Sequence, residues 1–373
     1  MPFAKYLSVS LLASVGLLSA CDGSGKQDQP NTPVASPSAV SNPMAAHDPA
    51  GGGPLDPAAA DDRPRIVMQQ QVVLDRLGFT PGVVDGKDGV STRNALAGFQ
   101  EANGLPITGA VDEATGGKLA AWSNIPATRV VTIPAEFAAG PFVTIPAKAS
   151  DQAKLDCLCY QNLDEKLAER FHTTVAVLKE LNPRSGPVPT GDAPWFAAGQ
   201  QVRVPNVGGD AVDPAAVDDP KWATTLDMLG VGPAQPKAAR VVVSKSKGTL
   251  KAFDQSGKLV AVYTATMGSQ HDPLPLGKWK IQGIGRNPDF HYNPKLFWDV
   301  KDSAKSALLK SGPNNPVGVV WIDISKPHYG IHGTPNPETI GRAESHGCVR
   351  LTNWDAARLA QMVSTTTELL FEA

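Results

Sequence analysis

The sequence predicts several domains of different classes: a mainly β C-terminal domain, preceded by a small helical unit and a small α+β unit. With 373 residues, the chain is longer than one ordinary domain. Apolar residues recur every three or four positions in the first half, and the period becomes two from Arg240 onward. Stretches rich in Pro, Gly and Asp lie between these patterns, so we expect folded units joined by linkers.

The first residues of the chain predict export. Lys5 precedes an apolar run over positions 7–18, which is too short for a membrane-spanning helix. Positions 18–21 read Leu-Ser-Ala-Cys and resemble a bacterial lipobox. That resemblance implies a signal peptide over residues 1–20 and a lipid on Cys21; an ordinary secretory signal cut after Ala20 is the alternative. We expect a lipoprotein in the periplasm, anchored to the inner or the outer membrane.

Residues 21–63 predict a disordered tether. The segment after Cys21 is rich in Pro, Gly, Ala, Ser and Asp and contains no aromatic residue. Such a composition cannot bury enough apolar surface to order itself. As a flexible chain of about forty residues, it would reach roughly 35 Å from the membrane.

Residues 64–122 predict three short helices. The first begins at Ile66 and stops before Gly78, the second is capped by Ser91 or Thr92, and the third covers 112–119. The motifs between and within the helices are Asp85-Gly86, Phe99-Gln100, Gly104-Leu105, Thr108-Gly109, Asp112 and Thr115. Together they resemble the three-helix peptidoglycan-binding domain, which implies peptidoglycan as a partner.

Residues 155–207 predict a smaller α+β unit. Apolar faces over 163–171 and 175–181 indicate two helices, and positions 198–205 indicate a strand. The helix–helix–strand order is similar to a LysM glycan-binding repeat, without its usual opening strand. Glycan binding and a plain structural spacer stay open as alternatives. A linker over 208–239 follows, with one short helix near Trp222.

Cys157 and Cys159 are two positions apart. In a strand their side chains would point to opposite faces, so we expect no disulfide between them. We expect small buried residues instead, with an oxidised pair as the alternative in an exported protein.

From Arg240 onward, period-two runs separated by Gly-containing turns predict strands. Helical periodicity returns at 304–310 and after Leu351, where Thr352 and Asp355 have the spacing of a capping box. The predicted strands cover 241–243, 248–253, 259–263, 279–281 and 317–324.

Cys348 lies near two histidines in the sequence, His332 and His346. A nucleophilic thiol needs a base within reach and backbone amides for an oxyanion, and Gly347 leaves such amides accessible. Spacing alone does not choose between the two histidines. A zinc site is the alternative, but the residues lack a known zinc-ligand spacing and an acidic base. We therefore expect no metal and no other cofactor.

The C-terminal motifs identify a family. They are Pro275-Leu276-Gly277-Lys278-Trp279, Asn314-Asn315-Pro316-Val317-Gly318, His332-Gly333-Thr334, Gly341, and Ser345-His346-Gly347-Cys348-Val349-Arg350-Leu351. They resemble the YkuD-type L,D-transpeptidase catalytic domain, over residues 240–373. The resemblance implies a β-sandwich with few helices.

The same resemblance implies a division of roles. Cys348 is the nucleophile and His332 is its general base, oriented by the Gly333 backbone. Amides near Gly347 and Cys348 form the oxyanion hole, Ser345 and His346 belong to the cysteine loop, and Arg350 pairs with a stem-peptide carboxylate.

The expected reaction is acyl transfer on peptidoglycan stem peptides through a Cys348 thioester. An amine acceptor would give a cross-link and water would give an L,D-carboxypeptidase, and removal of cross-links by the same thiol is a further alternative. A non-catalytic peptidoglycan-binding lipoprotein is the alternative from another class. The net charge of -2 argues against a nucleic-acid partner, and we expect a monomer.

Overall fold

The computed structural model describes residues 61, 63–184, 193–208, 212–296, 300 and 305–373. The chain divides into two units, residues 1–41 and 42–373, and all described residues belong to the second. The predicted signal peptide and Cys21 therefore lie outside the described residues. Among the helices of the described part, none combines the length and the apolar character needed to cross a membrane.

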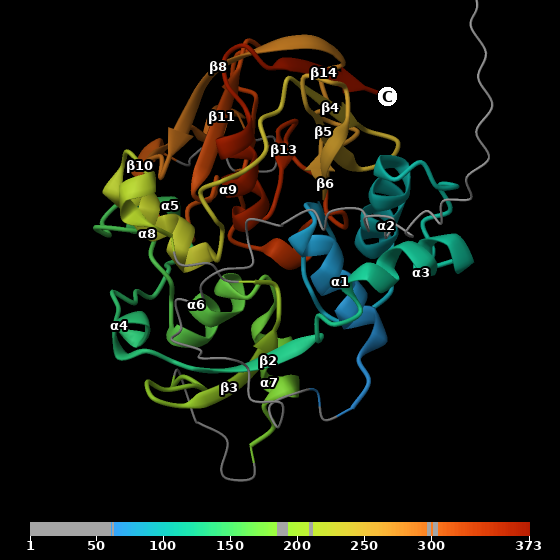
Figure 1. Ribbon diagram of the computed structural model, residues 1–373. Helices are drawn as coiled ribbons and strands as arrows, with labels where there is room; N and C mark the ends of the chain where they lie inside the picture. Colours follow the sequence, from blue (N-terminus) through green and yellow to red (C-terminus); the bar gives the residue numbers. More distant parts are fainter. Residues whose placement is uncertain (1–60, 62, 185–192, 209–211, 297–299, 301–304) are drawn as a thin grey trace, which may run out of the picture. The chain divides into compact units, whose positions relative to one another are not determined.

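The predicted helical unit consists of α1 (Ile66–Arg76), α2 (Val90–Ala102) and α3 (Glu113–Leu119) (Figure 1). Asp112 caps α3 by accepting a hydrogen bond from the Thr115 amide. The predicted cap of the second helix is wrong, because α2 begins one residue before Ser91, after Gly89. The Thr92 hydroxyl is instead buried and accepts a hydrogen bond from the Gln71 side chain at 3.0 Å.

The helical unit also adds a strand to the C-terminal domain. Strand β1 (Phe79–Thr80) pairs in parallel with β6 (Leu259–Thr264), with Phe79 opposite Val262. Phe79 and Phe99 share one apolar cluster with Val262. Two residues are too short a run for sequence periodicity to reveal, so this pairing was not predicted.

The α+β unit contains α6 (Leu163–Arg170), α7 (Val175–Leu181) and β3 (Gln201–Pro205), in the predicted order. Its boundary needs correction, because β3 pairs antiparallel with β2 (Thr128–Thr132), which lies upstream of residue 155. The missing first strand is therefore present, separated from α6 by a long segment. That segment holds α4 (Ala135–Ala138) and α5 (Ala149–Gln152).

Cys157 and Cys159 form a disulfide, so the prediction of two unpaired buried thiols is wrong. The two residues lie in irregular backbone rather than in a strand, and both are half-buried. Their side chains are therefore not forced to opposite faces, and their Cα atoms are 5.2 Å apart, within the range for a disulfide.

The C-terminal domain is built on one ten-stranded sheet, which confirms the predicted mainly β fold. Its strand order is β1-β6-β5-β4-β14-β8-β11-β12-β13-β7. The long strand β8 pairs with β14 through its first half and with β11 through its second half, so it joins the two halves of the sheet. The bounds are β4 (Arg240–Ser244), β5 (Thr249–Phe253), β7 (Thr266–Met267), β8 (Gly277–Arg286), β11 (Val320–Ile324), β12 (Gly330–His332), β13 (Val349–Arg350) and β14 (Glu368–Glu372).

A separate two-stranded ribbon, β9 (Phe290–Tyr292) with β10 (Ala307–Leu309), stands where a helix was predicted over 304–310. Residues 301–304 lie outside the described residues. Residues 307–309 form a ladder in which Leu309 lies opposite Phe290, so pairing with another strand overrides the local helical period.

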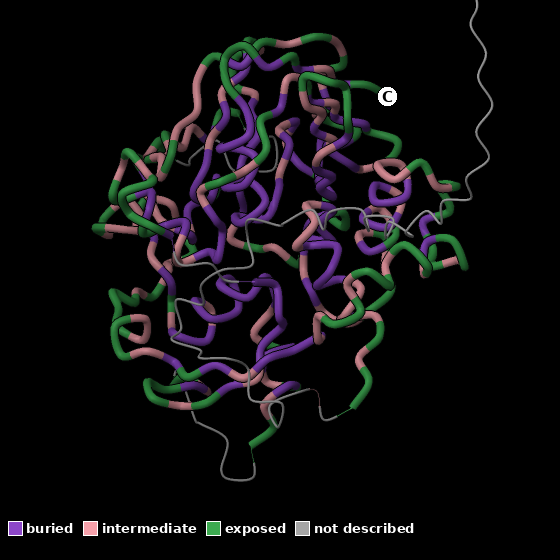
Figure 2. Tube along the Cα trace, viewed as in Figure 1, coloured by how far each residue is buried: buried purple, intermediate pink, exposed green. Residues whose placement is uncertain are grey.

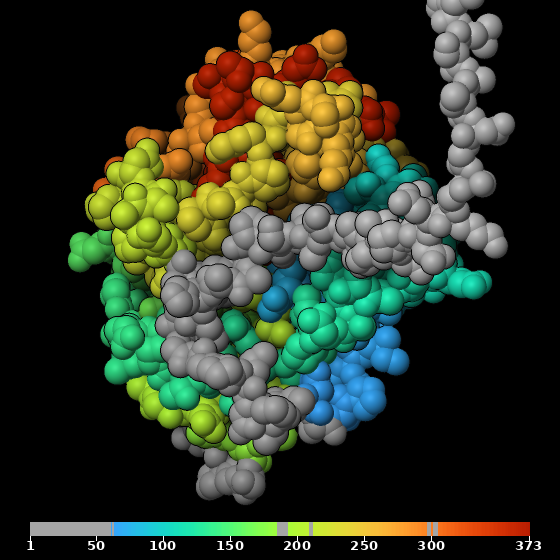
Figure 3. Space-filling view, in the orientation of Figure 1, coloured from blue at the N-terminus to red at the C-terminus, as the bar shows by residue number. Residues whose placement is uncertain are grey.

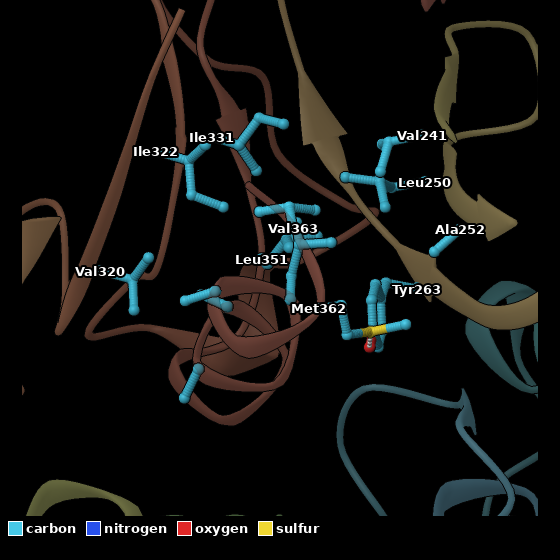
Figure 4. Packing of buried hydrophobic residues seen from close by; sticks show 14 of the residues in the cluster. Val241, Leu250, Ala252, Tyr263, Val320, Ile322, Ile331, Leu351, Met362 and Val363 are labelled. Atoms are coloured by element: carbon cyan, nitrogen blue, oxygen red, sulfur yellow. Dashed lines mark hydrogen bonds between the residues drawn. The ribbon is translucent and has the colours of Figure 1, made fainter. Parts of the chain in front are cut away.

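Both halves of the sheet and helix α9 (Asn353–Met362) contribute to one apolar core. Helix α9 is buried along its whole length, and the strands alternate buried and more exposed residues (Figure 2). Val241 and Leu250 come from one half, and Ile322 and Ile331 come from the other (Figure 4). Thr352 caps α9 at the Asp355 amide, as the capping-box spacing predicts.

The predicted short helix near Trp222 is α8 (Pro220–Leu229). Trp222 is almost completely buried and joins the core of the C-terminal domain. The yellow atoms of this stretch lie beside the orange and red atoms of the sheet (Figure 3). The segment therefore packs onto the sheet in addition to linking two units.

Candidate active site

Strands β12 and β13 bring the segments of His332 and Cys348 side by side. The strands are parallel, with Ile331 opposite Val349 and His332 opposite Arg350. Ile331 and Val349 are buried in the core. Side chains alternate along a strand, so His332 and Arg350 belong to the opposite face. Cys348 directly precedes β13 and lies in irregular backbone.

His332 is held in one tautomer. Its Nδ1 lies 2.6 Å from the carbonyl oxygen of Gly333. A carbonyl only accepts hydrogen bonds, so Nδ1 carries the proton and Nε2 keeps its lone pair. Burial and the Arg350 guanidinium lower the pKa of His332 to about 3, although the bond to Gly333 raises it. The imidazole is therefore neutral at neutral pH.

Trp321 of β11 stacks on the His332 ring, with the ring centroids 5.5 Å apart and the planes at 22°. A Cβ at Gly330 would lie 2.6 Å from the same indole, so Gly330 leaves room for it. The sequence analysis did not single out Trp321. Strand alternation could have revealed it, because its neighbour Ile322 faces the core.

Cys348 is half-buried, and its thiol lies 3.7 Å from the carbonyl oxygen of His328. Burial raises the pKa of the thiol, although the Gly330 backbone and the Arg350 guanidinium lower it. Both the thiol of Cys348 and the imidazole of His332 are therefore neutral at neutral pH, and a thiolate forms only as the proton leaves the sulfur.

The loop before Cys348 is fixed by Ser345. The Ser345 hydroxyl accepts a hydrogen bond from the Gly268 amide and donates one to the Cys348 carbonyl, both at 2.6 Å. Gly347 has a φ of 99°, and a Cβ there would overlap the Tyr329 ring. Only glycine fits this position next to the thiol, and His346 is half-buried in the same loop.

A cavity of about 750 Å³ lies elsewhere in the described part of the chain. It is lined by residues from all three units, including Pro335 and Gly341 of the loop between His332 and Cys348. Neither His332 nor Cys348 lines it. Across the described residues, no group of three or more His, Cys, Asp or Glu side chains could hold a metal ion.

The site thus combines a thiol, an imidazole held in one tautomer and an indole stacked on that imidazole. Residues 238–370 match the family model described as "L,D-transpeptidase catalytic domain" (YkuD), and residues 65–119 match "Putative peptidoglycan binding domain". The chain therefore carries a YkuD-type L,D-transpeptidase catalytic domain behind a peptidoglycan-binding domain.

Named relatives agree with this family. "Putative L,D-transpeptidase YkuD" of Bacillus licheniformis is 28% identical over 207 residues, which cover 55% of this chain and 90% of that protein. The Bacillus subtilis protein of the same name is 49% identical over 57 residues, 15% of this chain and 35% of that protein. Among solved structures, L,D-transpeptidase 3 from Mycobacterium tuberculosis aligns at 18% identity with a TM-score of 0.30, over 36% of this chain and 61% of that chain.

Proposed function

We propose that this protein is an L,D-transpeptidase that forms a thioester between Cys348 and a peptidoglycan stem tetrapeptide. The observation that carries the proposal is the pairing of β12 with β13, which brings the strand that ends at His332, with its unprotonated Nε2, beside the strand that Cys348 directly precedes. The family of residues 238–370 supports the same chemistry.

In the first step, the sulfur attacks the carbonyl of the third stem residue, and its proton passes to Nε2 of His332. Burial disfavours both the lone thiolate and the lone imidazolium, so the proton moves as the sulfur–carbon bond forms. The imidazolium then protonates the nitrogen of the leaving D-alanine.

In the second step, an amine of another stem attacks the thioester and gives its proton to His332. The sulfur leaves and takes the proton back, so the free enzyme is regenerated with a new amide bond. Water in place of the amine would give a tripeptide, which is the carboxypeptidase outcome.

The remaining site residues have supporting roles in this proposal. Amides near Gly347 and Cys348 receive the oxyanion, since the glycine leaves the backbone accessible. Arg350 lies close enough to influence both His332 and Cys348, and in this proposal its guanidinium pairs with a carboxylate of the stem peptide. Ser345 and His346 keep the cysteine loop in shape.

In this proposal, the units upstream of the catalytic domain bring the enzyme to its substrate. The peptidoglycan-binding domain would hold the enzyme on the wall, and the LysM-like unit would add a second glycan contact. A lipid on Cys21 would tether a monomeric enzyme in the periplasm. Cys21 lies outside the described residues, and its lipidation is tested by metabolic labelling with a palmitate analogue in wild type and Cys21→Ser.

The test of the reaction uses the purified protein and tetrapeptide muropeptides, with products read by mass spectrometry. Cross-linked dimers and a Cys348 adduct lacking one D-alanine are expected, and both should vanish in Cys348→Ala. His332→Ala should slow acylation by roughly 10²–10⁴-fold, the usual contribution of a general base. His271→Ala, at an exposed histidine, serves as the control.

Tripeptides without dimers would favour the carboxypeptidase. Retained binding to sacculi with no product of any kind would contradict an enzymatic function. If His346→Ala abolished acylation while His332→Ala left it unchanged, the base assignment would be wrong.

A further inference from the structure

A buried carboxylate of the α+β unit reaches into the C-terminal domain. Glu169, in α6, is 6% exposed and lies between two hydrogen-bond donors. Tyr160 donates its hydroxyl to Oε2 at 2.7 Å, and the Asn353 amide donates to Oε1 at 2.7 Å across 184 residues of sequence. Both partners donate, so they favour the ionised carboxylate.

Asn353, the first residue of α9, is completely buried. Its Nδ2 donates to Glu169 and to the Pro313 carbonyl, 3.2 Å away. Its Oδ1 accepts a hydrogen bond from the Val319 amide at 3.2 Å. The donor end of the side chain therefore joins the α+β unit to the C-terminal domain, and its acceptor end bonds the backbone of the C-terminal domain.

The acceptor end also lies against Gly333. A Cβ on Gly333 would overlap the Asn353 Oδ1, so the amide packs directly on that backbone. The Gly333 amide donates to the Val320 carbonyl at 3.3 Å, and the Gly333 carbonyl receives the His332 Nδ1 proton. Contacts thus run from Glu169 through Asn353 and Gly333 to His332.

Glu169 strengthens the observed orientation of the Asn353 amide. An amide turned over by 180° would place its NH2 group against the Val319 N–H, and its oxygen against both the Glu169 carboxylate and the Pro313 carbonyl. The bond to Glu169 is the shortest of the three and the one to a charged acceptor. Without Glu169, the amide is held less firmly against Gly333.

Stability alone does not account for a carboxylate at this place. Burial raises the pKa of Glu169 to about 7, although the bonds from Tyr160 and Asn353 lower it. An apolar pair of the same size is often at least as stable as a buried charged group.

We infer that Glu169 is a positioning residue for His332, so that the α+β unit completes the catalytic centre in addition to any glycan binding. The inference rests on the proposed function for its kinetic readout. The geometry of His332 can be measured without turnover, so the two claims can fail separately.

The test uses the full chain and four variants. Asn353→Asp places an acceptor opposite the Glu169 carboxylate, and Glu169→Gln replaces the charged acceptor by a neutral amide. The double variant restores a donor opposite a charged acceptor. Glu165→Gln is the matched control, because Glu165 also joins α6 to the C-terminal domain, through Asn314 at 2.8 Å, but does not touch Asn353.

The kinetic readout is the split between kcat and KM. Each single variant should lower kcat by about 10- to 100-fold with KM unchanged, as expected for a misplaced catalytic group. The double variant should recover part of that loss because the two residues are coupled. The control should stay within about twofold of wild type, because Glu165 does not contact Asn353.

The geometric readout is the downfield Nδ1 proton resonance of His332, assigned by its loss in His332→Gln. It should shift in Glu169→Gln and keep its position in Glu165→Gln. An unshifted resonance with unchanged kcat in Glu169→Gln would overturn the inference, as would an equal loss in the control.

If Glu169→Gln does not fold, Glu169→Asp takes its place, since it keeps the charge but is one methylene too short to reach Asn353. The same loss of kcat and the same shift are expected, and wild-type values would overturn the inference. If the resonance shifts as expected but wild type forms no product, the proposed function fails and the positioning role stands.

Discussion

The core of the C-terminal domain and the junction of the three units are equally buried but built from opposite kinds of side chain. In the core, Leu250 and Ile322 have no exposed surface and belong to one cluster of apolar side chains. In the junction, Asp75 of α1, His172 of the α+β unit and Arg358 of α9 are at most 2% exposed.

The junction is a network of directed contacts. Arg358 donates to both oxygens of Asp75, at 3.0 and 2.9 Å, across 283 residues of sequence. His172 lies 3.1 Å from the same carboxylate and stacks on Trp354. Thr80 donates to Asp355 at 2.9 Å. Burial raises the pKa of Asp75, but Arg358 and His172 outweigh it and hold that pKa well below its usual range.

The difference separates two tasks. Apolar packing is non-directional and supplies stability, so it suits a core that only has to exclude water. Charge pairs tolerate one geometry and are costly when a partner is missing, so they define how the units meet. The contact of Glu169 with Asn353 belongs to this second kind.

The largest effect is expected from breaking the junction. Asp75→Ala leaves Arg358 buried without its main partner, which should lower the free energy of unfolding by about 3–5 kcal/mol. Chemical denaturation measures the loss. Asp88→Ala is the control, since its pair with Arg93 is exposed and should change stability by less than about 0.5 kcal/mol. Equal losses in the two variants would mean that burial of the pair is irrelevant.

A somewhat smaller loss is expected in the core. Leu250→Ala removes buried methyl groups and leaves a cavity, at a cost of about 2–5 kcal/mol. The same denaturation experiment applies, with Leu276→Ala, at an exposed leucine, as the control. Leu250→Met should be tolerated with a loss under about 1.5 kcal/mol, because apolar packing accepts volume-conserving changes. Equal losses for Met and Ala would contradict a non-directional core.

The smallest effect is a pH dependence confined to the junction. Burial raises the pKa of Asp355 to about 7, although Arg358 lowers it. A carboxyl in the unfolded chain titrates near pH 4, at about 3.9 for Asp, so the stabilising contribution is complete below that pH and is lost as pH rises through about 7.

Asp355→Asn removes this titration. The free energy of unfolding of the variant minus that of wild type should therefore increase between pH 5 and pH 8, measured by denaturation at both values. The pKa of Glu169 is also raised by burial, but Glu169 is present in both proteins, so its contribution to the pH dependence cancels in the difference. A difference that does not change with pH would show that Asp355 is ionised throughout.

Much of the local structure could be predicted from the sequence, because its signals are local. Asp112 and Thr352 cap the helices that their spacing indicates, and the period-two runs form strands of the large sheet. The failures have one cause. Residues 307–309 pair with a distant strand, and Thr92 bonds to a distant side chain, so tertiary contacts replaced the local preference.

The sequence by itself determined the motif around Cys348, the family of the C-terminal domain and the peptidoglycan-binding helices. Each of these features depends on residues that are adjacent in the chain or recur at a regular spacing. Only the tertiary structure decided that β2 completes the α+β unit, that Asp75 meets Arg358, and that Glu169 supports the backbone beside His332. From the sequence alone, a charged residue on a helix is expected to face the solvent. Whether it is buried against a partner depends on chain segments hundreds of residues away, and no local pattern records that contact.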